Sequence, residues 1–409
     1  MTRVDTSEFL TVAQAADHAV STEKSAASRV SAENYWTPQR MRGAVEADTP
    51  ADAKASRKAA IDAAAKPARL ARPQKATTSK KAPGIRIATS IVQGKVFFHN
   101  PTNGGDYACS AAAVNNPTKN MVFTAGHCVH GGAGGTWATN WVFVPAYYNG
   151  SRPYGTWSAK TLTSFNGWIN SSDLNYDIGV VNVWDNGSSK LVDTVGGMGL
   201  GYTYGYVNTV TVWGYPAAFG YDGEVPYVCQ NIGTWQDGSR VQNGCTMVEG
   251  ASGGPWLRDY NETTGLGTEI AVTSTRTDRP AYIDSPYFDN KIQTIYNNTA
   301  NGRAPHRIRP GPRTRGPGLQ HRERTSCVRS PQPSSPRRRS WEPASSRPSP
   351  PPPGARTPEI HPPPTPRGPT ARSRRTPRTG TGAGARRTAR AHAHRPGRDR
   401  RAAIVAVGA

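Results

Sequence analysis

The chain has 409 residues and a formal net charge of +22, but the charge is distributed unevenly along it. Residues 303–409 carry 25 Arg, no Lys and four acidic side chains, a net charge of +21, whereas residues 84–302 carry a net charge of −4. A nucleic-acid-binding domain concentrates basic side chains on its own surface, so this distribution excludes specific nucleic-acid binding by residues 84–302. The chain also has no run of 18 apolar residues, which excludes a membrane-spanning helix.

Residues 1–83 are rich in Ala and charged side chains and poor in aromatic side chains. A segment with so little to bury cannot offset the conformational entropy that folding removes. We therefore expect a leader or propeptide followed by a linker, largely disordered. The first ten residues contain no continuous apolar core, so no signal peptide is visible there.

Residues 84–302 contain most of the aromatic side chains, and we expect one globular unit there. Short β-forming runs alternate with Gly, Asn and Pro, a pattern typical of β-sandwiches and β-barrels. The runs cover residues 86–92, 95–98, 121–124, 141–144, 178–183, 209–213 and 270–273. One helix is predicted over residues 288–296, with Ile292, Ile295 and Tyr296 on one face.

Four of the five cysteines lie in this globular unit, and they form two locally spaced pairs. Four thiols allow three connectivities, of which the spacing favours Cys109–Cys128 and Cys229–Cys245. Four free thiols in a cytosolic protein are the alternative. Because disulfides persist in oxidising compartments, we expect a secreted, extracellular protein, although no signal peptide is visible in the chain.

Residues 303–409 contain 21 Pro and lack Phe, Tyr, Met, Asn and Lys entirely. This composition does not support a packed core, so we expect a disordered tail. The missing residue types share AT-rich codons, which is typical of a high-GC sequence translated in a shifted reading frame. The alternative is a genuine basic tail that binds polyanions weakly and with strong salt dependence.

The segment Thr124-Ala-Gly-His-Cys128 places a histidine just after a predicted strand. A general base must be held in one orientation, and a disulfide from the neighbouring cysteine would help to hold it. His99 and His130 are the other histidines in the globular unit, and neither lies in such a motif. A metal cluster formed by His127-Cys-Val-His130 is an alternative, but no further plausible ligand group joins it.

The segment Asn175-Tyr-Asp-Ile-Gly-Val-Val181 places an aspartate at the head of an apolar strand. A carboxylate in that position can accept the second ring N–H of a histidine and stabilise the imidazolium. Asp177 and the nearby Asp173 are both candidates on this ground.

The segment Glu249-Gly-Ala-Ser-Gly-Gly-Pro255 carries the strongest signal. Small residues on both sides expose the hydroxyl of Ser252 on a tight turn and direct backbone N–H groups toward one point. A flexible glycine-rich loop is the structural alternative. The segment also fits the Gly-x-Ser-x-Gly turn of the α/β-hydrolases, which would make the protein a serine esterase.

The chain order of the motifs separates these two hydrolase folds. An α/β-hydrolase places its acid and its histidine after the serine. The histidines that follow Ser252 all lie in the basic tail, at positions 306, 321, 361, 392 and 394. The order His127, Asp177, Ser252 is the chymotrypsin order instead.

These motifs resemble those of the secreted bacterial trypsin-like serine peptidases, with Gly179 and Ala251 as small departures. The resemblance implies that His127 is the base, that Asp177 rather than Asp173 orients it, and that Ser252 is the nucleophile. It also implies an oxyanion hole formed by the N–H groups of Gly250 and Ser252. The implied fold is all-β: two six-stranded antiparallel β-barrels, at about residues 84–190 and 191–286, followed by a short helix at about residues 287–299.

Two further segments extend the resemblance. Thr209-Val-Thr-Val-Trp-Gly-Tyr-Pro216 is similar to the Gly-Tyr-Pro strand of the glutamyl-endopeptidase-like branch, and Tyr35-Trp-Thr-Pro-Gln-Arg-Met41 is similar to a propeptide motif. The likeness covers residues 33–43 and 88–300.

The same resemblance places Thr246 at the base of the primary substrate pocket and Ser274 in its wall. A neutral Thr246 argues against trypsin-like selection of Arg or Lys. Thr273 stands where glutamyl-specific relatives have a His. Arg276 can instead pair with an acidic side chain, while Glu249 at the pocket mouth opposes acidic substrates.

We therefore expect a secreted, monomeric serine endopeptidase that acts on protein or peptide substrates without a cofactor or metal and without a membrane partner. The alternatives are a catalytically silent homologue that acts as a binding module, a serine esterase, and a polyanion-binding protein whose activity resides in the tail.

Overall fold

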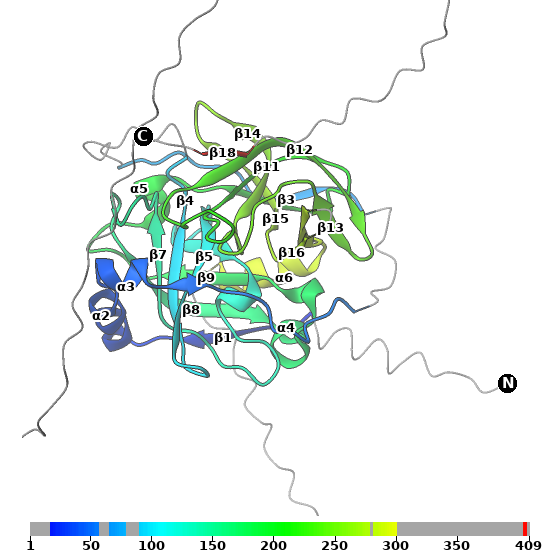
Figure 1. Ribbon diagram of the computed structural model, residues 1–409. Coiled ribbons are helices and arrows are strands. Elements are labelled where there is room, and N and C mark those ends of the chain that lie inside the picture. Colours follow the sequence, from blue (N-terminus) through cyan, green and yellow to red (C-terminus); the bar gives the residue numbers. More distant parts are fainter. Residues whose placement is uncertain (1–16, 57–64, 79–89, 279–280, 301–403, 407–409) are drawn as a thin grey trace, which may run out of the picture. The chain divides into compact units, whose positions relative to one another are not determined.

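Two β-sheets form most of the computed structural model, which describes residues 17–56, 65–78, 90–278, 281–300 and 404–406 (Figure 1). The first sheet contains β1 (Ala19–Glu23), β2 (Val45–Glu46), β4 (Gln93–Asn100), β5 (Gly105–Val114), β6 (Met121–Thr124), β7 (Thr139–Pro145), β8 (Trp157–Phe165) and β9 (Gly179–Val183). The second contains β3 (Ala68–Ala71), β10 (Gly199–Tyr202), β11 (Thr209–Gly214), β12 (Tyr227–Asp237), β13 (Arg240–Asn243), β14 (Pro255–Asn261), β15 (Leu266–Val272), β16 (Thr275–Asp278), β17 (Ala281–Pro286) and β18 (Ile404–Ala406).

The helices are short. They are α2 (Ala26–Tyr35), α3 (Pro38–Arg42), α4 (Asn166–Ser171), α5 (Leu191–Val195) and α6 (Lys291–Thr299), with the 3₁₀ turns η1 (Gly126–Cys128) and η2 (Leu174–Tyr176). The predicted C-terminal helix is confirmed in α6, and its predicted apolar face is buried through Ile292, Ile295 and Tyr296.

The first sheet closes into a six-stranded antiparallel barrel. Its strands pair in the cycle β4–β5–β6–β9–β8–β7 and back to β4. Every residue of β6 and β9 is buried, which is why these strands read as continuous apolar runs. The expected all-β fold is confirmed, and this sheet is the first of the two expected barrels.

The second sheet follows the order β16-β17-β13-β12-β11-β14-β15-β10-β3. Its pairs are antiparallel except for β10 with β15. Among the described residues, β3 and β16 stand at the ends of this ladder, so the second half is a sheet and not the closed barrel that we expected. Its core includes Val212, Trp256, Ala271 and the Cys229–Cys245 disulfide.

Residues 17–56 and 65–78 of the leader pack onto this body, so in the described part the expectation that residues 1–83 are largely disordered is wrong. Strand β1 pairs with β8, and β3 pairs with β10. Backbone hydrogen bonds to a sheet edge stabilise an added strand whatever its side chains are, so a composition poor in aromatics does not prevent folding. Two bulky side chains of the leader, Trp36 and Met41, are also buried, and their burial adds hydrophobic stabilisation.

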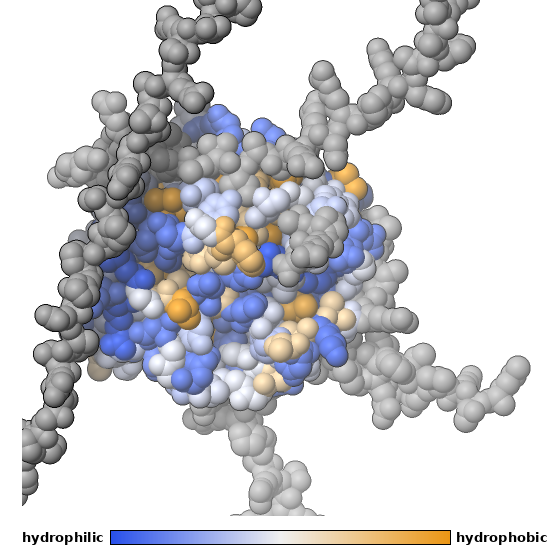
Figure 2. All heavy atoms as spheres, viewed as in Figure 1, coloured by the Kyte–Doolittle hydropathy of each residue, from blue (hydrophilic) through white to orange (hydrophobic). Residues whose placement is uncertain are grey.

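The basic tail lies outside the described residues except for residues 404–406, which form β18 and pair with β12. This short strand departs from the expected disorder of residues 303–409. In the described part of the chain, no helix is long and apolar enough to cross a membrane. The visible surface is mostly hydrophilic, with apolar side chains in small patches (Figure 2).

One carboxyl group is buried in the second sheet without a partner. Glu269 on β15 is fully buried, and neither of its carboxyl oxygens has a hydrogen-bond partner among the described residues. Burial raises the pKa of this carboxyl well above its usual range. Burial therefore favours the protonated, neutral form of Glu269 in the folded protein.

We expect Glu269→Gln to stabilise the protein at neutral pH. Above the unfolded-state pKa of about 4.3, the unfolded chain ionises Glu269 while the folded chain keeps it protonated, so wild-type stability falls by about 1.4 kcal/mol per pH unit until the folded pKa is reached. The advantage of Glu269→Gln should disappear as the pH approaches 4. Denaturant unfolding at several pH values measures it, with the exposed Glu262→Gln as control; a pH-independent difference for Glu269→Gln would contradict the assignment.

Candidate active site

His127 lies in η1, directly after β6, at the point where the closed barrel meets the second sheet. The Cys109–Cys128 disulfide joins η1 to β5, so the favoured pairing is present in the structure. The His127 backbone N–H donates to Asp177 Oδ1 at 2.8 Å, and His127 Nδ1 lies 2.9 Å from Asp177 Oδ2. The ring is therefore fixed through both its backbone and its side chain.

Asp177 follows η2 and precedes β9, and its side chain is fully buried. Ser274 Oγ donates a third hydrogen bond to it, 2.6 Å from Oδ2. Burial alone raises the pKa of the Asp177 carboxyl, but the charge and hydrogen bonds of His127 and the Ser274 hydroxyl hold that pKa below its usual range. The carboxylate stays ionised and can stabilise an imidazolium at His127.

The turn that carries Ser252 needs its glycines. Gly250 and Gly253 have φ angles of +91° and +79°, a region that L side chains rarely adopt. A Cβ atom on Gly253 would also lie 2.0 Å from Thr124 Oγ1, and one on Gly250 would lie 2.5 Å from the carbonyl oxygen of Tyr215.

Ser110 on β5 fixes this turn to the closed barrel. Its backbone N–H donates to the Ser252 carbonyl at 2.7 Å, and its hydroxyl donates to the Gly250 carbonyl at 2.8 Å. The same hydroxyl accepts the N–H of Tyr215. Within the described part of the chain, the N–H groups of Gly250 and Ser252 have no backbone acceptor, as donors of an oxyanion hole require.

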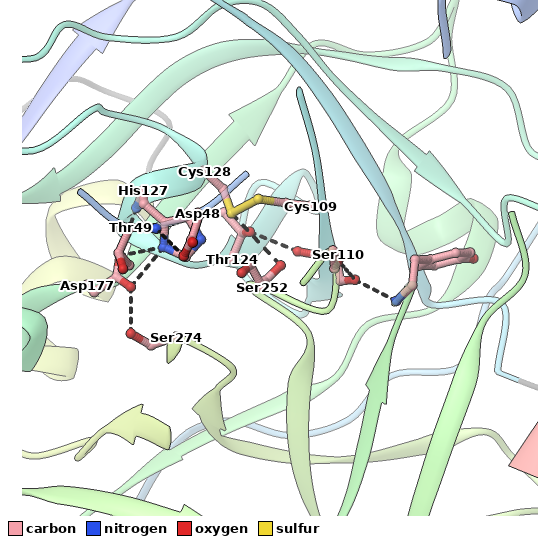
Figure 3. The surroundings of a disulfide bond; sticks show 12 residues. Asp48, Thr49, Cys109, Ser110, Thr124, His127, Cys128, Asp177, Ser252 and Ser274 are labelled. Carbon is pink, nitrogen blue, oxygen red and sulfur yellow. Dashed lines mark hydrogen bonds and ion pairs between the residues drawn. A yellow bond between two sulfur atoms is a disulfide. The ribbon is translucent and has the colours of Figure 1, made fainter. Parts of the chain in front are cut away.

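Figure 3 shows how these residues gather around the Cys109–Cys128 disulfide. His127 Nε2 is buried and has no hydrogen-bond partner among the described residues, so it is not bonded to Ser252 here. The hydrogen bond between a nucleophile and its base is often long in a ligand-free protein and shortens when substrate binds.

The other candidate residues have structural roles. Asp173 caps η2 by accepting the N–H of Asn175. His130 accepts the N–H of Gly132, and burial lowers the pKa of His130 to about 4. His99 lies on β4 beside Asp106.

The donor set around His127 does not fit a metal ion. Ligand atoms of Cys109, His127 and Cys128 lie within 4.8 Å of one another. The two sulfur atoms are bonded to each other in the disulfide, however, and zinc takes cysteine as the thiolate.

Beside Ser252 the surface opens into a cavity of about 250 Å³. Its lining residues are Asp48, Thr49, Met247, Val248, Glu249, Ser252, Thr273, Ser274, Thr275, Arg276 and Ile283. The expected wall residues Glu249, Thr273, Ser274 and Arg276 are brought together here. Arg276 Nε is paired with Glu249 Oε1 at 2.8 Å.

Thr246 is absent from this lining, and its side chain is exposed. This corrects the expectation that it forms the pocket base. Met247 and Val248, the next two residues, line the cavity instead. Sequence reasoning also missed Ser110, Asp48 and Thr49, because no local motif marks a contact made across the fold.

Three comparisons place the chain among known proteins. It is 30% identical to the solved thermostable serine protease AL20 from an extremophilic microorganism, a match that covers 53% of this chain and 100% of that protein with a TM-score of 0.49. It is 38% identical over 109 residues to the extracellular metalloprotease of Bacillus subtilis and 34% identical over 97 residues to the glutamyl endopeptidase of Bacillus licheniformis.

The identity to AL20 extends over the whole of that protein, from one end of its chain to the other. The chain belongs to the trypsin-like serine protease family. This membership confirms the resemblance to the glutamyl-endopeptidase-like branch, and no family model matches the chain. The matches span only 27% and 23% of this chain and 30% and 29% of the two curated relatives.

We expect removal of either disulfide of this serine protease to cost similar stability but different activity. The bonds close loops of similar length, with separations of 19 and 16 residues, worth about 3 kcal/mol each in the chain-entropy model. Replacing Cys109 and Cys128 by Ser should also loosen His127 and lower kcat, whereas replacing Cys229 and Cys245 should leave kcat nearly unchanged below the melting temperature. Equal loss of kcat in both double variants would contradict a role for the first bond in holding the base.

Proposed function

We propose that the chain is a secreted serine endopeptidase in which Ser252 is the nucleophile, His127 the general base and Asp177 the residue that orients the base. The observation that carries this proposal is the buried contact between His127 Nδ1 and Asp177, beside a turn in which two glycines with positive φ lie on either side of Ser252. The two disulfides support an extracellular location, since such bonds persist in oxidising compartments.

In the proposed reaction, Ser252 Oγ attacks the carbonyl carbon of a peptide bond and His127 Nε2 accepts the hydroxyl proton. The oxygen that becomes negative is stabilised by the N–H groups of Gly250 and Ser252. The tetrahedral intermediate then breaks its C–N bond, the amine leaves with the proton from His127, and an acyl group remains on Ser252. Water, deprotonated by His127, then attacks the acyl carbon; the bond from that carbon to Ser252 Oγ breaks, His127 returns the proton to Ser252 Oγ, and the acyl group leaves as a carboxylic acid.

A fluorophosphonate probe tests this assignment. We expect it to label the wild-type chain but not Ser252→Ala, because the probe reacts only with an activated serine hydroxyl. Ser252→Ala should also lower kcat by about 10⁴–10⁶-fold on a peptide substrate.

Asp48 and Thr49 line the cavity beside Ser252 and can limit the access of the probe. The labelling should therefore be measured before and after the chain is cut at a protease site inserted between residues 56 and 65, which separates these two residues from the rest of the chain. Circular dichroism shows whether both variants are folded. Labelling that is absent, or equal in wild type and Ser252→Ala, in folded and cut protein would favour a catalytically silent homologue that acts as a binding module.

The cavity beside Ser252 is the proposed binding site for the substrate residue before the cleaved bond. Its walls combine apolar side chains, Met247 and Ile283, with the ion pair between Arg276 and Glu249. The carboxylate of Glu249 balances the charge of the Arg276 guanidinium. An acidic substrate side chain must therefore compete with Glu249 for Arg276.

We expect Glu249→Gln to raise kcat/KM for substrates with Glu at that position, relative to Gln, by about two- to fivefold, the value of one partly exposed ion pair. Arg276→Ala should lower the same ratio. A peptide library with matched Glu and Gln substrates measures both ratios. An unchanged ratio in both variants would show that Arg276 does not select the substrate charge.

A further inference from the structure

An exposed aromatic side chain stands at the edge of the candidate substrate cavity. Phe219 lies in the loop that joins β11 to β12, and it is 76% exposed. Within the described part of the chain, the exposed large apolar residues are Val30, Val45, Val207 and Phe219, and Phe219 is the one aromatic residue among them. Because leaving a large apolar side chain in water forgoes the stabilisation of burial, its presence here is not explained by packing.

The backbone at Phe219 is also strained. Phe219 and Gly220 have φ angles of +52° and +97°, and the N–H of Tyr221 donates to the carbonyl of Ala218 at 3.1 Å. A turn with positive φ at both central positions favours Gly, Asn or Asp there, and a bulky side chain in this region is disfavoured. Strained residues of this kind cluster at functional sites, so we looked for what the Phe219 ring faces.

The loop that carries this turn is fastened at both ends. At its start, the N–H of Ala217 donates to the carbonyl of Glu249 at 2.7 Å. Near its end, the hydroxyl of Tyr147 donates to Glu224 Oε2 at 2.8 Å, and Lys95 Nζ lies 3.6 Å from Glu224 Oε1. The Lys95 side chain is only 4% exposed, so moving the loop would leave a buried charge without its partner.

The Phe219 ring lies against a residue of the cavity wall. Arg276 Cζ lies over this ring, 4.7 Å from its centroid. Arg276 and its ion-pair partner Glu249 both line the cavity, whereas Phe219 is outside the lining. Glu249 therefore holds the loop through its carbonyl and Arg276 through its carboxylate, and the Phe219 ring stands at the rim of the cavity.

The same loop packs against the turn that carries Ser252. A Cβ atom on Gly250 would lie 3.1 Å from the backbone nitrogen of Ala217 and 3.2 Å from its Cβ. A peptide whose carbonyl group reaches Ser252 places one side chain in the cavity, and its neighbours follow at about 3.3 Å per residue in an extended chain. The side chains next to the cavity residue thus pass within reach of the rim.

We propose that Phe219 is a specificity-determining residue that packs against an apolar side chain of the peptide substrate, within two residues of the one in the cavity. The proposal rests on the proposed function and names its substrate class, peptides with an aliphatic or aromatic side chain at that neighbouring position. An aromatic ring offers a large contact area and loses little conformational entropy on binding. A cationic side chain is disfavoured there, because Arg276 already lies on the ring and like charges repel.

The first test measures substrate preference with the full chain, before and after it is cut at the site inserted between residues 56 and 65. Peptides with Gln as the cavity residue carry Phe, Leu, Ser or Lys at one of the two positions on either side of it. We expect kcat/KM at one of these positions to be about fivefold higher with Phe or Leu than with Ser, and lowest with Lys. Phe219→Asn should reduce the Phe-to-Ser ratio at that position to about one.

Two further variants serve as controls. Phe219→Tyr keeps the ring and should retain the preference. Val207→Ala removes another exposed apolar side chain, which is 82% exposed and lies in the loop between β10 and β11. It should leave every ratio unchanged. A preference that Val207→Ala abolishes equally, or that Phe219→Tyr does not retain, would overturn the assignment to the ring.

Thermal unfolding separates substrate contact from a role in the fold. Asn tolerates a positive φ, so Phe219→Asn should relieve strain and raise the melting temperature by about 2 °C. A lower melting temperature would contradict the proposal, because the ring would then stabilise the fold. So would a change confined to the Glu-to-Gln ratio at the cavity residue, because Phe219 would then act only by positioning Arg276.

Peptide binding to the Ser252→Ala chain separates this proposal from the assignment of the nucleophile. Fluorescence anisotropy measures the affinity of fluorescein-labelled forms of the same peptides. The Phe peptide should bind about fivefold more tightly than the Ser peptide, and adding Phe219→Asn should remove the difference. If the wild type cleaves no peptide but this difference is found, the role of Phe219 stands and the assignment of Ser252 fails. The absence of a Phe219-dependent difference in both assays would overturn the role of Phe219.

Discussion

The rest of the site depends on the buried, ionised carboxylate of Asp177. An unpaired carboxylate in the interior costs several kcal/mol, so its hydrogen-bond donors must be in place before the fold is stable. Those donors come from both halves of the molecule: His127 from the closed barrel and Ser274 from the second sheet. The hydrogen bonds that stabilise this one charge thus couple the packing of the two sheets to the orientation of His127.

The Ser252 turn is also held by buried hydrogen bonds between the two sheets. Its carbonyl groups are satisfied by Ser110, which lies on the barrel strand next to Cys109. Ser252, which lies just before β14 of the second sheet, is thereby positioned by the first sheet, and His127 on η1 is tied to the same strand by a disulfide. Strand β2 also pairs with β5, two residues before Cys109 and Ser110 begin these contacts.

Much of this arrangement could be predicted from the sequence, because it depends on local patterns. The strand runs, the apolar face of the last helix and the three motifs each span fewer than a dozen residues. The features that were missed are set by contacts between distant segments. The pairing of the leader uses backbone groups, which leave no trace in composition, and no local pattern marks which side of the chain Thr246 faces.

The central claim is that Ser252 becomes acylated during turnover. It is tested most directly by quenching the protein in acid during hydrolysis of an activated peptide ester and then measuring its intact mass and mapping its peptides. The account predicts one added acyl group, located on Ser252 and absent from Ser252→Ala. An adduct on another residue, or turnover with no covalent adduct at any quench time, would contradict it.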